Sequence, residues 1–116
     1  MRVGIDAVEI ARIEKSLGIN GFKERVFSEK EISMLDGKGG HAQSYAGNFA
    51  AKEAFSKALG TGVRGFSLNE ISILRDELGA PYLELIGNAK EAAKGLSFTV
   101  SLTHTTTDAT AVVIAF

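Results

Sequence analysis

Polar side chains that could do chemistry gather at three places in this sequence. They are Asp6 after the apolar run MRVGI, the group Lys52, Glu53 and Lys57 within YAGNFAAKEAFSKALG, and the segment SLTHTTT, Ser101–Thr107, which contains His104. Glu53 and Lys57 are four residues apart, so they would share one face of a helix. Each place also has an ordinary explanation. An exposed ion pair of this spacing adds only about 0.3–0.5 kcal/mol to a helix, an aspartate after a strand often caps a helix or forms a turn, and a histidine is common in turns.

The three places considered together favour one kind of chemistry. Asp6 and Glu53 are carboxylates without a cysteine partner, which suits a hard cation such as Mg²⁺. Magnesium held by one or two protein carboxylates usually takes its other ligands from water and from substrate phosphates. Lysine, histidine and threonine side chains donate hydrogen bonds to phosphates. The residues therefore predict a Mg²⁺-dependent site for a phosphorylated ligand, although no Walker-type glycine loop supports it.

Composition limits the alternatives. The chain has 116 residues, of which 45% are hydrophobic and 23% charged, and this predicts one globular domain over residues 1–116. The net charge of −1 gives no sign of a nucleic-acid or membrane partner. The sequence has no cysteine, and its N-terminus is too short in apolar residues and too acidic for a signal peptide. We expect a soluble, cytoplasmic protein.

Periodicity predicts the elements that must position these residues. The central one is a helix over Tyr45–Gly60, made of good helix formers without proline and stopped by Gly60 and Gly62. The other expected elements, in chain order, are a strand over Met1–Ile5, a helix over Glu9–Leu17, a helix over Glu29–Leu35 opened by a Ser28/Glu31 capping box, a hairpin of strands Leu68–Leu74 and Pro81–Ile86, a short helix over Asn88–Lys94, and strands over Leu96–Leu102 and Thr110–Phe116. The predicted class is α+β, with a mainly antiparallel sheet packed on a long central helix.

The motifs GIDAVEIARIEK, FSEKEISML, NFAAKEAFSKALGTG, GAPYLEL and SLTHTTTDATAVVIA occur in this order along almost the whole chain. In this respect the sequence resembles the holo-(acyl-carrier-protein) synthases, the small single-domain type of 4′-phosphopantetheinyl transferase. The specific feature is the pairing of G-x-D-x-x-E-I with F-A-A-K-E-A-x-x-K. Neither half alone would identify the family.

The resemblance implies transfer of 4′-phosphopantetheine from coenzyme A to a serine of apo acyl carrier protein, with adenosine 3′,5′-bisphosphate leaving. Asp6, Glu53 and Lys57 would be the catalytic residues, and Asp6 and Glu53 would bind Mg²⁺ across the coenzyme pyrophosphate. Lys57 would hold or protonate the departing phosphate. The serine proton would pass to Glu53, Asp6 or a metal-bound water, and the sequence does not choose among them.

The resemblance also implies binding surfaces. The residues expected to contact coenzyme A are Asn48, Lys52, Lys57, Gly62, Pro81, His104 and Thr105. Relatives of this size are homotrimers with the coenzyme between subunits, so His104, Thr105 and Pro81 would come from the neighbour of the chain that supplies Asp6 and Glu53. Arg12, with Lys15 and Arg25, would dock the acidic carrier protein. For Lys15 and Arg25 an ordinary solvated helix face is the alternative.

Three residues depart from the family pattern. Asn48 stands where relatives commonly have arginine, so one phosphate contact is lost or supplied differently. Thr103 replaces the usual serine before His104, and Asp108 replaces a usual tyrosine and would oppose a polyanion if it pointed inward. The alternatives to the transferase are another Mg²⁺-dependent nucleotide enzyme, a non-catalytic domain that binds coenzyme A or the carrier, and a structural oligomerisation domain.

Overall fold

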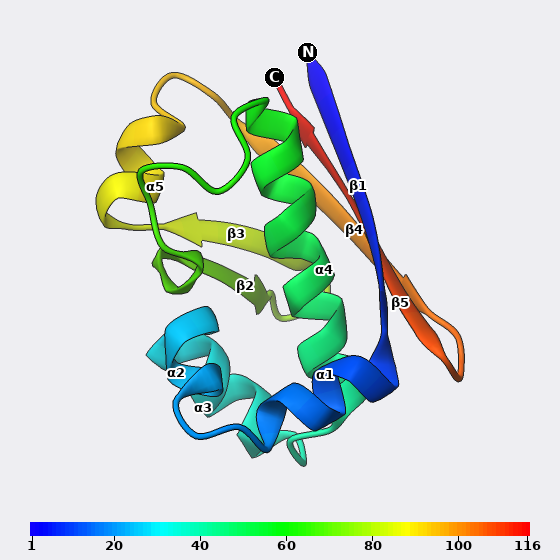
Figure 1. Ribbon diagram of the computed structural model, residues 1–116. Helices are drawn as coiled ribbons and strands as arrows, with labels where there is room; N and C mark the ends of the chain where they lie inside the picture. The colour runs from blue at the N-terminus through cyan, green and yellow to red at the C-terminus, as the bar shows by residue number, and fades with distance from the viewer.

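Helix α4, Ala42–Leu59, lies against one face of a three-stranded sheet in the computed structural model, which describes residues 1–116 (Figure 1). The sheet has the order β1–β5–β4, and both pairings are antiparallel. In chain order the elements are β1 Arg2–Glu9, α1 Ile10–Leu17, α2 Phe22–Val26, α3 Glu29–Gly37, α4, a 3₁₀ turn η1 Leu68–Glu70, β2 Ile71–Arg75, β3 Pro81–Leu85, α5 Gly87–Ala92, β4 Phe98–His104 and β5 Asp108–Ala115. The predicted α+β class is confirmed. The hairpin β2–β3 forms a separate two-stranded sheet, which the sequence did not indicate.

Small residues explain how close α4 lies to the sheet. The inner face of β5 presents Ala109, Ala111, Val113 and Ala115, all buried, toward the alanine-rich helix. On β1, a Cβ atom added to Gly4 would lie only 1.9 Å from the carbonyl oxygen of Ala54, so only glycine fits at this contact. Gly60, with a φ of 81°, ends α4 as predicted. The positions of Asp6 and of α4 relative to each other are therefore fixed by backbone packing.

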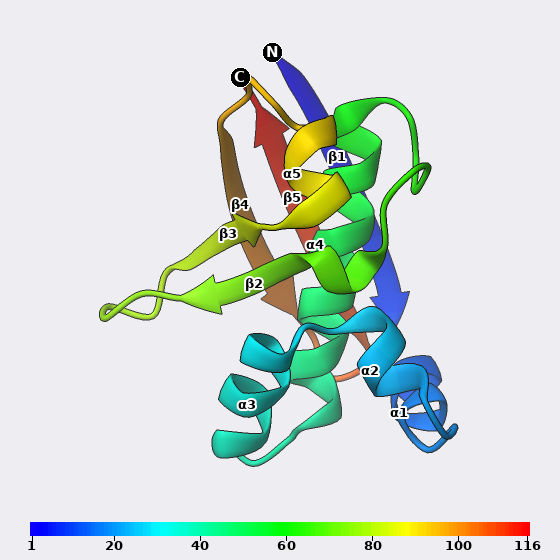
Figure 2. The ribbon, with the colours of Figure 1, turned by 90° about the vertical axis from the view of Figure 1, so that its left-hand side faces the viewer.

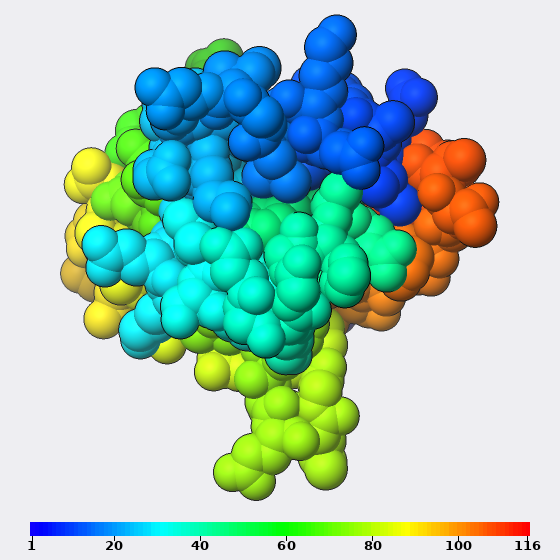
Figure 3. All heavy atoms as spheres, turned by 90° about the horizontal axis from the view of Figure 1, so that it is seen from below, coloured from blue at the N-terminus to red at the C-terminus, as the bar shows by residue number.

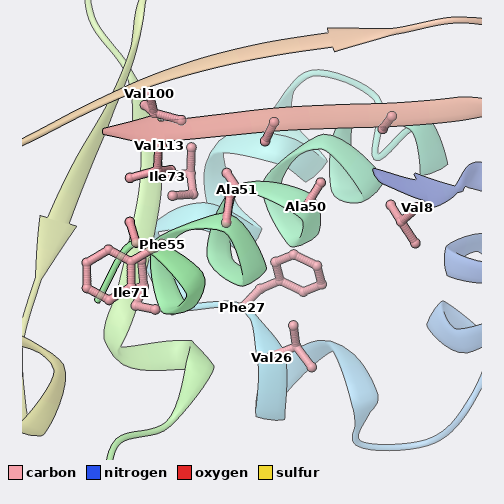
Figure 4. Close-up of a cluster of buried hydrophobic side chains, with 14 of the residues drawn as sticks. Val8, Val26, Phe27, Ala50, Ala51, Phe55, Ile71, Ile73, Val100 and Val113 are labelled. Atoms are coloured by element: carbon pink, nitrogen blue, oxygen red, sulfur yellow. The ribbon is translucent and has the colours of Figure 1, made fainter. Parts of the chain in front are cut away.

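The apolar core continues on the other side of α4. Figure 4 shows Phe55 and Ala51 of α4 with Ile71 and Ile73 of β2 and Val113 of β5. Helices α1, α2 and α3 cover one end of α4 (Figure 1). At the start of α3 the predicted capping box is present: the Ser28 hydroxyl accepts from the Glu31 backbone, and the Glu31 carboxylate accepts from the Ser28 backbone.

Most strand boundaries differ from the sequence prediction by one to four residues, and the largest differences are at the end of β1 and the start of β2. Strand β1 runs to Glu9 because its whole length pairs with β5, from Arg2 opposite Ala115 to Glu9 opposite Asp108. Asp6 therefore lies within the strand and not after it. The segment Leu68–Glu70, predicted as strand, is the turn η1, because the Glu70 carboxylate accepts from the Ser67 backbone and closes a capping box.

The outer face of the three-stranded sheet has no helix over it (Figure 1). Val3 is 64% exposed and Ile5 61% exposed. They pair directly with Ile114 and Val112 of β5, so the four side chains share this face. An apolar sheet face left open to solvent is typical of a surface that binds another protein.

The hairpin β2–β3 extends sideways from the rest of the molecule, and the two termini lie together at the end opposite helices α1, α2 and α3 (Figure 2). Seen from below, the yellow-green tip of this hairpin projects, and the blue residues of α1 lie beside the orange turn between β4 and β5 (Figure 3). A backbone hydrogen bond of 2.9 Å from Ile10 to Thr107 joins these last two segments. None of the helices has both the length and the apolar character needed to cross a bilayer.

Candidate functional site

Strand β1 and helix α4 bring Asp6, Lys57 and Glu53 together. Asp6 pairs with Ala111, whose side chain is buried under α4, so Asp6 faces the helix. The Lys57 ammonium donates to Asp6 Oδ1 at 3.2 Å and to the Ile5 carbonyl at 2.9 Å. Glu53 lies one turn earlier on the same face of α4. The sequence-predicted trio is therefore one cluster, although its residues lie about fifty positions apart in the chain.

The two carboxylates of this cluster, Asp6 and Glu53, repel each other. Partial burial raises the pKa of Glu53, and the negative charge of Asp6 raises this pKa further. The positive charges of Lys57 and Arg12 act in the opposite direction. A carboxylate whose charged form is disfavoured by burial and by a like charge is typical of functional sites.

These residues fit a divalent cation. Two half-buried carboxylates provide hard oxygen ligands and a repulsion that a cation would relieve. No group of three or more histidine, cysteine, aspartate or glutamate side chains surrounds a common point. This donor set suits Mg²⁺, which keeps waters and takes phosphate oxygens as further ligands, more than Zn²⁺, which needs a fuller set of protein ligands.

His104 and Thr105 lie at the opposite edge of the sheet from Asp6. Strand β5 separates β1 from β4, so Asp6 and His104 belong to strands about 10 Å apart, twice the usual strand spacing. Thr105 organises the turn that follows, because its hydroxyl oxygen accepts from the backbone N–H groups of Thr107 and Asp108. One chain therefore does not bring His104 and Thr105 to the Asp6 cluster.

Asp108 has a hydrogen-bond partner within its own turn. Its carboxylate accepts a hydrogen bond of 2.8 Å from the Thr107 hydroxyl within the same turn. The aspartate that stands here in place of the family's usual tyrosine is therefore hydrogen-bonded to its neighbour in the turn.

Lys52 and Asn48 do not fit their predicted role as coenzyme contacts, because both side chains are completely buried. Lys52 donates to Glu31 Oε1 at 2.5 Å, to the Leu68 carbonyl at 2.9 Å and to the Ile71 carbonyl. All three ammonium protons therefore have partners inside the protein. Burial lowers the pKa of Lys52, and the charge of Glu31 opposes that change.

Asn48 belongs to the same buried network. Its amide donates to Glu31 Oε2 at 2.9 Å and to the Ile73 carbonyl at 3.0 Å, while its oxygen accepts from Arg75 at 3.1 Å. No buried side-chain polar atom lacks a partner. Asn48 and Lys52 thus hold α3, α4 and β2 together instead of facing a ligand.

The remaining predicted residues lie on the surface in separate places. Gly62 is in the exposed loop after α4, near the end that carries Lys57. Pro81 begins β3 opposite Arg75, at the base of the projecting tip. Arg12 and Lys15 are exposed on α1, three residues apart, and Arg25 is exposed on α2. Of these, only Arg12 is close enough to influence Glu53.

Sequence reasoning missed two residues. Glu31 was identified only as a helix cap, yet its carboxylate also accepts from Lys52, Asn48 and the Ile73 backbone. Arg75 was assigned to a turn, yet it lines a hollow with His104. The capping motif was the only local signal for Glu31, and Arg75 had none.

Comparison with known proteins agrees with this arrangement. The sequence model of the 4′-phosphopantetheinyl transferase superfamily matches residues 2–112. The holo-[acyl-carrier-protein] synthase of Treponema denticola is 48% identical over 116 residues, covering 97% of this chain and 94% of that protein. That of Fusobacterium nucleatum is 41% identical over 119 residues, covering 97% of this chain and 95% of that protein.

A solved structure shows the same fold. The crystal structure of Helicobacter pylori holo-[acyl-carrier-protein] synthase in complex with coenzyme A superposes with a TM-score of 0.85 at 36% identity, covering 98% of this chain and 99% of that one. The match thus extends over every element that carries the Asp6 cluster and the His104 turn. With the fold, the sequence and the paired carboxylates in agreement, this chain belongs to the 4′-phosphopantetheinyl transferase superfamily.

Proposed function

We propose that this protein is a holo-(acyl-carrier-protein) synthase, which transfers 4′-phosphopantetheine from coenzyme A to a serine hydroxyl of apo acyl carrier protein. The observation that carries the proposal is the nearly full-length identity of 41% and 48% to proteins of that name. The Asp6–Glu53–Lys57 cluster supports it, because phosphoryl transfer depends mainly on positioning and on stabilising charge.

Asp6 and Glu53 would hold Mg²⁺. The cation would supply charge stabilisation on the pyrophosphate oxygens of coenzyme A. The chain contributes two carboxylates placed by rigid elements, β1 and α4, which keeps their separation fixed.

Lys57 would bind the phosphate that leaves with adenosine 3′,5′-bisphosphate. Its ammonium has three protons, of which two are used by Ile5 and Asp6. The side chain is 55% exposed, so the third proton is free for a ligand. The serine proton would pass to Asp6, Glu53 or a water beside them.

Arg12 would meet the acidic carrier protein. It projects from the exposed face of α1, next to Glu53, so a carrier bound there would present its serine at the cluster. Exposed charges at an interface mostly accelerate association and make it depend on salt. Lys15 and Arg25 would extend the same basic surface.

The active form would be a homotrimer with each site shared between two chains. Two observations support this. The outer sheet face leaves Val3 and Ile5 exposed, and a partner could cover them. In addition, His104 and Thr105 lie on the far edge strand from Asp6, so they would complete the site of a neighbouring chain.

A mass measurement tests the reaction. The protein is incubated with apo acyl carrier protein, coenzyme A and Mg²⁺, with and without a chelator, and the carrier is weighed. A gain of one phosphopantetheine unit that the chelator prevents is expected. No gain with a carrier that a known synthase can modify would contradict the proposal and favour a non-catalytic binding domain.

A further inference from the structure

A hollow of about 650 Å³ lies between helix α5 and the strands β3 and β4, and we call it the α5 hollow. Small-molecule sites usually have volumes of about 300–1,000 Å³, with apolar walls and a few polar groups. The apolar lining of the α5 hollow consists of Leu83 and Leu85 on β3, Ala93 after α5, Leu96 before β4 and Phe98 at the start of β4. In size and lining it therefore resembles a site for a small molecule.

The α5 hollow is remote from the Asp6 cluster and from His104. Phe98 pairs with Ala115, four residues along β5 from Ala111, which is the partner of Asp6. At about 3.4 Å per residue, four residues correspond to about 14 Å along the sheet. His104 is at the other end of β4, six residues or about 20 Å from Phe98. A ligand in the α5 hollow would therefore occupy neither of these places.

The core holds the wall at Phe98 in place. The centroid of its ring lies 4.9 Å from that of Phe55 on α4, which is completely buried. Leu96, by contrast, is 44% exposed. A bound apolar group that covered Leu96 would remove apolar surface from water, which favours binding.

Three charged side chains also line the α5 hollow, namely Lys90, Glu91 and Lys94. The two lysines are exposed and four positions apart, so they follow one another by about one helical turn at the end of α5. None of the three takes part in any of the four ion pairs. Two positive charges and one negative charge give the lining a net charge of +1.

The extent of the lining indicates a small molecule and not a protein. Eleven residues line the hollow, whereas a stable protein interface covers about 20–30 residues on each side. The apolar walls favour an apolar body, and the net charge of +1 favours a single negative charge beside it. A carboxylate carries one negative charge at neutral pH, while a phosphate monoester carries about 1.5–2.

We propose that the α5 hollow binds a small amphiphilic carboxylate, with its apolar body against Phe98 and its head group at Lys90 and Lys94. This site is additional to the Asp6 cluster and does not depend on the proposed function.

Titrations with three six-carbon probes test the charge preference. Hexanoate, 1-hexanol and hexylamine share one apolar chain and differ in the charge of the head group. Binding is followed by the amide resonances of Leu96 and Phe98 in two-dimensional NMR spectra, up to about 10 mM probe, which nearly saturates a site of about 1 mM affinity. Hexanoate should bind about tenfold more tightly than the other two, the effect of a charge-assisted hydrogen bond.

Reversing the charge of the lining makes the expectation specific. In Lys90→Glu/Lys94→Glu the net charge of the lining changes from +1 to −3, so hexanoate should bind at least about tenfold more weakly and hexylamine should become the tighter ligand. The control Lys15→Glu/Lys38→Glu makes the same change of charge at exposed positions on α1 and after α3. It should leave all three affinities within about twofold, because distant exposed charges are screened.

Two results would overturn the proposal. Equal affinities for hexanoate and 1-hexanol would leave an apolar hollow without a preference for an anion. No change in the Leu96 and Phe98 resonances at the highest probe concentration would remove the site. If the double variant melts at a lower temperature, Lys94→Gln replaces it, and the preference for hexanoate over 1-hexanol should then fall to about threefold. Carrier modification by the unmodified protein is measured separately, so failure of the proposed function is distinguishable from failure of this site.

Discussion

Asp6 and Glu53 carry most of the proposed chemistry, and their environment is unfavourable for the fold alone. Each adds negative charge to a site that partly excludes water. Partial burial raises the pKa of Glu53, and the charge of Asp6 raises this pKa further. Proteins retain such arrangements mainly where function requires them. Replacing either residue should therefore separate activity from stability.

We predict that Asp6→Asn and Glu53→Gln each lower the turnover rate by at least about 100-fold. Metal-held charge contributes several kcal/mol to such transition states, and each 1.4 kcal/mol corresponds to a factor of ten. The rate of carrier modification is measured for both variants and for the control Glu91→Gln on exposed α5. Full activity in Asp6→Asn and Glu53→Gln would refute the metal assignment.

Glu53→Gln should also melt at a higher temperature than the unmodified protein at neutral pH in the presence of a chelator. A carboxyl whose pKa is higher in the folded state loses stability as the pH rises through its unfolded-state value. The variant removes this penalty. The gain should vanish below the unfolded-state pKa, where both forms are neutral, and a gain that persists in acid would have another cause. Melting curves at several pH values measure it.

A different outcome is expected at Arg12, which faces the proposed carrier surface. Arg12→Ala should weaken carrier binding about threefold to tenfold, with a smaller dependence on salt, because an exposed rim charge acts mainly on association. Coenzyme A affinity should stay within about twofold. Association kinetics over a range of salt concentrations measure the first effect, with Lys38→Ala, exposed after α3, as a control. Equal loss of carrier and coenzyme binding would indicate a folding defect.

At the scale of elements, one buried ion pair connects three segments. Glu31 of α3 meets Lys52 of α4, and Lys52 in turn donates to Ile71 at the start of β2. Neither charged side chain is accessible to solvent. The pair therefore fixes how α3 and the β2–β3 hairpin sit on α4, and with them the direction in which Asn48 and Arg75 point.

Breaking the buried Lys52–Glu31 ion pair should destabilise the fold more than breaking a surface ion pair. We predict that Lys52→Met lowers the free energy of unfolding by about 3–5 kcal/mol, because it leaves the Glu31 charge buried and unpaired. The control Lys30→Met breaks the exposed pair with Glu84 and should cost at most about 1 kcal/mol. Urea unfolding at a fixed protein concentration compares them.

The double variant Glu31→Gln/Lys52→Met makes the prediction specific. Removing both charges should cost clearly less than the two single changes added together, because no unpaired charge remains. Additive losses would mean that Glu31 and Lys52 act independently, and the structural account of this network would be wrong.

At the scale of the whole molecule, the chain presents two incomplete halves of a site. The Asp6 cluster lies at the β1 edge of the sheet, and the His104 turn lies at the β4 edge. The exposed apolar face around Val3 and Ile5 offers a surface through which copies could associate. A trimer of 12.3 kDa chains would bury this face and join the halves.

Mixing two inactive variants tests the shared site. Asp6→Ala and His104→Ala chains should each be nearly inactive alone. When they are unfolded together and refolded in equal amounts, roughly a quarter of the sites formed by random exchange would combine an intact Asp6 with an intact His104 from another chain. Activity should return to about that fraction. Absence of recovery in a mixture that still forms trimers by light scattering would place each site within one chain.

The sequence by itself predicted most of the elements and the reaction class, but not the short helix α2, Phe22–Val26. Apolar spacing and stop signals predicted α4 and the hairpin, and the Ser28–Glu31 motif predicted a helix cap that is present. These features depend on residues within a few positions of each other. The motifs around Asp6 and Glu53 identified the family because they pair a strand with a helix in a specific order.

Only the tertiary structure decided which polar residues face a ligand. Lys52 and Glu53 are neighbours in sequence, but one step along a helix turns the side chain by about 100°. Lys52 therefore enters the core beside Glu31, while Glu53 faces Asp6. Arg75 is likewise directed by Asn48, 27 positions away. Such pairings arise from how α3, α4 and β2 pack, and no local pattern in the chain encodes them.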